Sequence, residues 1–106
     1  MTRSDQPKGT QNVLRDLGFD DADELSAKAL LALKINSIVE LRGISQTEVA
    51  RLTGMTQPKV SQVRNYKLLN ISLERLMLAL VALDQRVEIT VRPARRSFSA
   101  GISVMA

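Results

Sequence analysis

The sequence predicts a mainly α-helical protein of four to five helices with one short β-strand near the C-terminus. Three observations indicate this fold class. Apolar residues recur at helical spacing over most of the chain, a Ser or Thr stands where each later helix should begin, and one stretch alternates strictly between apolar and polar residues. Only 3% of the residues are aromatic, so the core must be aliphatic, which suits packed helices.

The first long helix is predicted over residues 22–41. Four acidic residues between positions 20 and 24 complement the positive end of the helix dipole. Arg42 and Gly43 then end the helix with a cation and with a residue that readily takes a left-handed conformation.

Capping residues predict the next helices. Ser45 and Glu48 have the spacing of a capping box, and this second helix ends at Gly54. Thr56 caps a third helix, Pro58 lies in its first turn, and the helix continues to about residue 65. Ser72 caps a fourth helix.

The second and third predicted helices have the spacing of a helix-turn-helix, which spans residues 45–66. Two short helices that cross closely need a small residue at the crossing, here Ala50, and a sharp turn, here Gly54. The apolar side chains that fix their angle are expected to point into the core: Val49, Met55, Val60 and Val63.

The exposed face of the third helix is polar and cationic. Segment 45–67 has four basic residues against Glu48 alone, so its net charge of +3 is most of the chain's +4. An ordinary helical hairpin with a glycine turn would mix charges of both signs. The pattern therefore favours a double-stranded DNA partner, with this helix in the major groove, over that alternative.

Composition excludes several other kinds of chemistry. The sequence has no Cys and no His, which excludes disulfides, Cys or His metal sites, and Ser-His or Cys-His catalysis. Capping explains the acidic cluster of residues 16–24 better than a nuclease or hydrolase site does, and the +3 segment argues against a pure scaffold. No apolar run approaches the ~20 residues of a membrane span, and no signal peptide is visible. We expect a cytoplasmic protein that is no enzyme, needs no cofactor or metal and has no membrane partner.

One predicted strand, Val87 to Arg92, alternates apolar and polar residues and stops at Pro93. A single strand cannot stand alone, so its apolar residues Val87, Ile89 and Val91 are expected to pair with the same strand of a second copy. Such a homodimer would present two recognition helices to a pseudo-palindromic operator. The alternative is a hairpin with residues 97–104.

Two segments, residues 45–50 (SQTEVA) and 54–61 (GMTQPKVS), resemble the Cro/C1 phage-repressor family of helix-turn-helix proteins. Over residues 12–93 the sequence is more similar to one branch, the HigA-type antitoxins and related XRE-type regulators. The resemblance implies a phage-repressor-like DNA-binding domain at residues 13–86. A flexible arm (1–12) precedes it, and a dimerisation strand (87–93) and a flexible tail (94–106) follow.

The resemblance also implies a function. It indicates a transcriptional repressor that is the antitoxin of a type II toxin–antitoxin pair and regulates its own operon. Its second partner would be a small RNA-cleaving toxin, bound by residues 1–19 or 97–106. The alternative is a stand-alone XRE-type regulator without a toxin.

By this resemblance, the DNA-contacting residues lie on the second and third helices. Gln46 donates to a phosphate, and Thr56 both caps its helix and reaches a phosphate. Gln57 pairs with adenine, and Lys59 reaches guanine or a phosphate. The remaining predicted contacts are Ser61 and Gln62 at base edges, and Arg64, Asn65 and Lys67 at the DNA backbone.

Two positions depart from the family pattern. Thr53 stands where an aliphatic residue is usual, and residues 66–69 (YKLL) replace a turn that commonly contains glycine. These departures leave open the local packing of the second helix and the path of the loop after the third.

Overall fold

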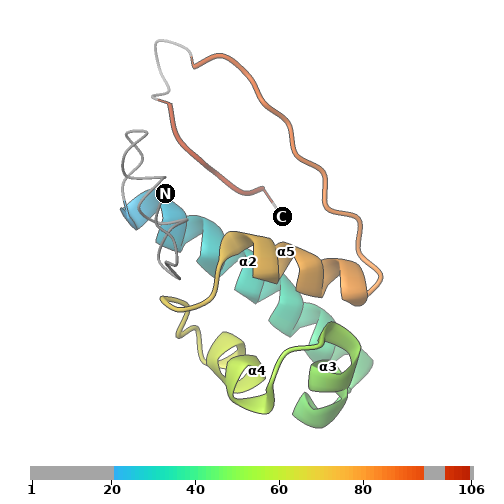
Figure 1. Ribbon diagram of the computed structural model, residues 1–106. Coiled ribbons are helices and arrows are strands. Elements are labelled where there is room, and N and C mark those ends of the chain that lie inside the picture. The colour runs from blue at the N-terminus through green and yellow to red at the C-terminus, as the bar shows by residue number, and fades with distance from the viewer. Residues whose placement is uncertain (1–20, 95–99, 106) are drawn as a thin grey trace.

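The computed structural model describes residues 21–94 and 100–105, and within them it contains four α-helices. These are α2 (Asp21–Arg42), α3 (Gln46–Thr53), α4 (Gln57–Arg64) and α5 (Leu73–Ala82). Helices α2 and α5 pack against each other, and α3 and α4 lie together on one side of them (Figure 1). The mainly helical prediction is confirmed, and the predicted starts of all four helices and the predicted ends of α2, α3 and α4 lie within one or two residues of the observed ones. The predicted arm (1–12) lies outside the described residues.

An aliphatic core joins the four helices. Ala32, Leu76 and Leu83 are fully buried at its centre, and each helix contributes at least one buried side chain to it. The four apolar residues predicted to fix the helix-turn-helix angle are all buried: Val49, Met55, Val60 and Val63. None of the described helices has the length and apolar character needed to cross a membrane.

The predicted caps are present at the start of α3, α4 and α5. The side-chain oxygens of Ser45, Thr56 and Ser72 accept hydrogen bonds from the backbone N–H three residues later, at 3.1, 3.3 and 3.1 Å. Only half of the predicted capping box forms, however. The carboxylate of Glu48 accepts hydrogen bonds from Arg51, 3.0 Å from its Nε, because that side chain lies on the same exposed face one turn later.

Among the described residues, four that lie outside the helices take left-handed backbone conformations. Gly43 (φ 65°) and Gly54 (φ 77°) do so as predicted, and Asp84 (φ 67°) does so after α5. Tyr66 (φ 59°) takes this conformation directly after α4, where the family pattern has a glycine-containing turn. The loop therefore keeps the sharp turn although its sequence lacks the residue best suited to it.

The loop that follows Tyr66 is held by a buried ion pair that the sequence analysis missed. The ammonium of Lys28 lies 3.0 Å from the carboxylate of Glu24 and donates to the carbonyl of Leu68 at 3.2 Å. The Lys28 residue is only 1% exposed. A buried charge needs a partner of this kind, so α2 and the loop are fixed to each other at this point.

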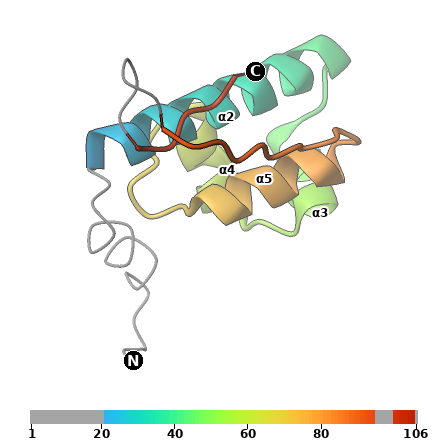
Figure 2. The same cartoon turned by 90° about the horizontal axis from the view of Figure 1, so that it is seen from above.

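The predicted C-terminal strand is not confirmed. Residues 85–94 form neither helix nor strand, and no backbone hydrogen bond joins residues 86–94 to another described segment. With residues 100–105 they lie on the side of α2 and α5 opposite α3 and α4 (Figures 1 and 2). A β-strand needs a neighbouring strand to pair its backbone N–H and C=O groups. Among the described residues, no segment pairs with residues 86–94 in this way.

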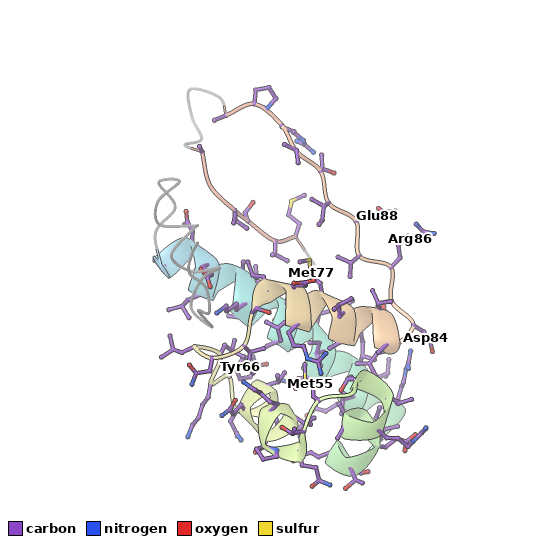
Figure 3. The ribbon with its side chains drawn as sticks, viewed as in Figure 1. Met55, Tyr66, Met77, Asp84, Arg86 and Glu88 are labelled. Carbon is purple, nitrogen blue, oxygen red and sulfur yellow. The ribbon has the colours of Figure 1, made fainter. Side chains whose placement is uncertain are left out.

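The predicted role of Val87 at a dimer interface stays a prediction, and in the single chain its side chain packs on the core. It is half-buried against the core of its own domain, as is Val104. Ile89 and Val91 are 74% and 90% exposed. Figure 3 shows Arg86 and Glu88 pointing away from the helices, as expected for an extended segment whose alternate residues face opposite sides.

Candidate nucleic-acid interface

Helices α3 and α4 cross closely because the turn between them is short and tightly bonded. Gly54 follows α3 in a left-handed conformation, and its N–H donates to the carbonyl of Ala50 at 2.9 Å. Met55 then turns into the core, between α5 and α4 in Figure 3. The inward apolar residues of both helices meet in the core, so the outward face of α4 is held at a fixed angle to α3.

The outward face of α4 is polar, and the predicted contact residues on it differ in exposure. Thr56, Gln57 and Arg64 are exposed. Lys59, Ser61 and Gln62 are half-buried, and the amide oxygen of Gln62 is buried without a hydrogen-bond partner. That oxygen faces the protein, so only the amide nitrogen of Gln62 is left to approach a base. The predicted contacts thus share one helix without being equally accessible.

Gln57, at the first turn of α4, lies beside α3. Its amide nitrogen is 3.4 Å from the hydroxyl of Thr47, which is at the long limit of a hydrogen bond. Such a contact orients the side chain weakly and leaves its amide oxygen free. The amide can therefore offer the paired acceptor and donor that match adenine in the major groove.

Lys59 reaches back to the loop after α4. Its ammonium donates to the carbonyl of Asn70 at 2.9 Å, in an exposed position. The ammonium keeps two further N–H donors for a phosphate. Asn70 was not among the predicted site residues, because a backbone carbonyl leaves no trace in the sequence pattern.

The C-terminal end of α4 carries three of the predicted backbone contacts. The guanidinium of Arg64 is 3.6 Å from the carboxylate of Glu40 on α2. The amide nitrogen of Asn65 donates to the carbonyl of Ser61 at 2.9 Å. Lys67 is exposed. Arg64 and Lys67 are thus the charged groups at this end that can turn to a DNA phosphate, whereas the Asn65 amide is already bonded within its own helix.

At the start of α3, Gln46 is exposed in the first turn, and its predicted phosphate contact stays a prediction. The nearby carboxylate of Glu48 belongs to the exposed pair with Arg51. Their hydrogen bond, and then their mutual charge attraction, lower the pKa of Glu48. Arg51 thus offsets the one acidic side chain of segment 45–67, and the other three basic residues give the segment its net charge of +3.

Comparison with known proteins places this geometry in a family. A family model described as a helix-turn-helix domain matches residues 13–92. The chain belongs to this helix-turn-helix family. One solved structure is similar to this helix-turn-helix protein with a TM-score of 0.74 and 48% sequence identity. It covers 82% of this chain and 99% of the other, which is provisionally named an XRE-family transcriptional regulator. No curated protein matches the sequence.

The structural similarity supports the coarser part of the sequence-based assignment. The helix-turn-helix match includes α2 to α5 and the open segment up to residue 92, so the family unit extends beyond α3 and α4. The finer assignment, to the HigA-type antitoxin branch, is not tested by these comparisons. Within the helix-turn-helix protein, the predicted DNA contacts therefore remain predictions that rest on exposure, charge and position on α4.

Proposed function

We propose that this protein is a sequence-specific DNA-binding transcriptional regulator that acts as a repressor. The observation that carries the proposal is the outward face of α4, which holds polar and cationic side chains at a fixed angle to α3. The family match and the name of the similar solved structure support the same function. In this function Gln57 reads a base, while Gln46, Lys59 and Arg64 contact the duplex backbone.

The test is binding of the purified protein to the DNA upstream of its own gene, measured over a salt series. A repressor that uses α4 should bind this DNA tightly, with an affinity that falls linearly with the logarithm of salt concentration. Gln57→Ala should lose about 1–3 kcal/mol of binding free energy on this DNA and little on unrelated DNA. Equal binding of both DNAs by the parent, or an unchanged Gln57→Ala variant, would refute base reading by α4.

We further propose that the regulator binds a pseudo-palindromic operator as a homodimer. Ile89 and Val91 are exposed, and the backbone of residues 86–94 has no ladder partner in the described chain. Pairing of this segment with a second copy would bury both side chains and complete the backbone hydrogen bonds. Because the segment lies on the side away from α3 and α4, such a dimer leaves both α4 helices uncovered.

The biological setting that we propose is a type II toxin–antitoxin pair in which this protein is the autoregulating antitoxin. The proposal rests on the sequence resemblance given above and on the separate α4 face, which a toxin bound elsewhere would leave free. A stand-alone XRE-type regulator is the alternative.

Co-expression with the product of the adjacent open reading frame distinguishes the two. An antitoxin should co-purify with that product and relieve its growth inhibition, and it should still do so when Gln57→Ala has weakened DNA binding. Growth inhibition that persists, or a neighbour of unrelated function, would favour the stand-alone regulator.

A further inference from the structure

A cavity of about 340 Å³ lies between the helix-turn-helix and α2. Its walls come from all four described helices, with Ala79 contributed by α5. The cavity opens to solvent, and most of its inner lining is apolar. The apolar side chains that enclose it are Ile35, Val39, Ile44, Val49, Met55 and Val60.

Thr53 leaves part of this space open. This residue lines the cavity at the end of α3, at the position where the family pattern has an aliphatic residue. Its hydroxyl donates to the carbonyl of Val49 at 2.7 Å and accepts from the N–H of Met55 at 3.2 Å. The side chain is therefore tied to the local backbone, and it is shorter than a Leu or Ile that could extend into the space.

The mouth of the cavity is polar. Among its described lining residues, Glu40 and Arg64 carry the charges, and their side chains pair at 3.6 Å while 70% and 42% exposed. Asn36 is also present there and donates to the carbonyl of Val63 at 3.1 Å. An exposed ion pair of this kind stabilises a protein little, so the more exposed Glu40 can give way to another anion.

This combination defines the chemistry of a ligand. The volume falls at the lower end of the range for small-molecule sites, and an apolar interior with a few polar groups at one end is typical of them. The guanidinium of Arg64 offers two parallel donors that match a carboxylate. We propose that the cavity binds a small amphipathic carboxylate, with its apolar chain or ring among Val39, Val49 and Val60 and its carboxylate on Arg64 in place of Glu40.

Occupancy would act on DNA binding through α4. Val60 and Val63 on its inner face line the cavity, whereas its outer face carries the proposed DNA contacts. A ligand that engages Arg64 withdraws that side chain from the duplex. Because coupling between two sites is reciprocal, DNA should weaken ligand binding by the same factor, about tenfold within the usual range of 5–150-fold. This regulatory step rests on the proposed function, whereas ligand binding itself does not.

The direct test is titration of the full chain with octanoate, 1-octanol and octylamine, followed by amide NMR shifts and calorimetry. Octanoate should saturate with shifts concentrated at Val49, Val60 and Val63, and it should bind more tightly than the alcohol and the amine. Thr53→Leu should extend a bulkier apolar side chain into the cavity and weaken binding of all three, while it keeps the circular dichroism of the parent. Arg64→Gln should remove the preference for the acid over the alcohol.

Arg51→Gln is the matched control, since it removes an equal charge from α3 outside the cavity and should leave octanoate binding unchanged. If Thr53→Leu misfolds, Arg64→Gln still tests the proposed site, because it alters an exposed side chain. Non-saturating shifts, or octanoate affinity unchanged in Thr53→Leu, would overturn the site. Equal affinity for acid, alcohol and amine would overturn the role of Arg64.

The regulatory step is tested separately, by DNA affinity with and without octanoate. An unchanged affinity in the presence of bound octanoate would overturn the coupling and leave the site intact. If the parent binds no DNA at all, the proposed function fails, but the titration still decides whether the cavity is a ligand site.

Discussion

Tyr66 is the residue at which local sequence and local backbone disagree most clearly. Its φ of 59° lies in the left-handed region, which costs a non-glycine residue about 1–2 kcal/mol. The ring is 47% exposed, so its packing offsets only part of that cost. The turn is retained because the buried Lys28–Leu68 contact and the core position of Leu68 fix the chain just beyond it.

The first prediction is that Tyr66→Gly raises the free energy of unfolding by about 0.5–1 kcal/mol. Relief of the left-handed strain exceeds the extra entropy that glycine gives to the unfolded chain. Urea unfolding at neutral pH measures the change. Lys67→Gly, one residue later in the same loop and without a positive φ, should instead lower stability. A Tyr66→Gly variant less stable than the parent would mean that ring contacts outweigh backbone strain.

The second prediction concerns the buried pair of Glu24 and Lys28. Lys28→Met leaves a buried carboxylate without its cation and the Leu68 carbonyl without its donor, so it should cost about 3–5 kcal/mol of stability. The double variant Glu24→Met with Lys28→Met removes both charges and should recover most of that loss. A double-mutant cycle by urea unfolding measures the coupling.

Lys34→Met, on an exposed part of the same helix, serves as the control and should change stability by less than about 0.5 kcal/mol. A single Lys28→Met variant as stable as this control would show that the pair contributes nothing to holding the loop.

At the scale of single elements, α4 and the following loop act together. The Lys59 ammonium bonded to the Asn70 carbonyl links the middle of α4 to the loop that Lys28 fixes to α2. These two contacts connect α4, through the loop, to α2.

The third prediction is that Lys59→Ala weakens binding to operator and to unrelated DNA by a similar factor and lowers the salt slope by about one. We expect this result if the Lys59 ammonium contacts a phosphate while it keeps its hydrogen bond to the Asn70 carbonyl. Lys34→Ala removes an equal charge from α2 and should leave the slope unchanged. Should Lys59→Ala lose affinity for the operator alone, Lys59 would be a base contact instead.

Sequence reasoning succeeded where structure is determined locally. The Ser45, Thr56 and Ser72 caps and the turn at Gly54 depend on neighbours within four residues, so their positions could be predicted closely. It failed where a distant partner decides the outcome. A buried Lys28 looks like any helical lysine in the sequence, and neither the Asn70 carbonyl near Lys59 nor the inward oxygen of Gln62 has a sequence signal.

The predicted strand likewise depends on a partner that the local sequence does not specify. The alternation over residues 87–92 correctly describes an extended segment with exposed Ile89 and Val91, but a ladder depends on what lies beside it. The side chain of Val87 packs against the core of its own domain. The alternating pattern alone assigns this side chain to an interface with a second copy.

At the scale of the whole molecule, the two proposed interaction surfaces lie on opposite sides of the α2–α5 layer. Helix α4 is on one side, and the open segment of residues 86–94 is on the other (Figure 1). Dimerisation through that segment would join two DNA-binding units without covering either α4. Linking two half-site contacts in this way typically raises affinity by about 10²–10⁴-fold over one unit alone.

The fourth prediction tests this arrangement with Ile89→Lys and Val91→Lys. Each places a charge on the exposed apolar face of the segment, so sedimentation should change from dimer to monomer while the helical circular dichroism stays that of the parent. Operator affinity should fall about 10²-fold or more, because each unit then binds its half-site alone. Thr90→Lys adds an equal charge on the opposite face of the same segment and should leave the dimer intact. A dimer that survives Ile89→Lys and Val91→Lys would place the interface elsewhere, and the exposed segment would then need a different partner.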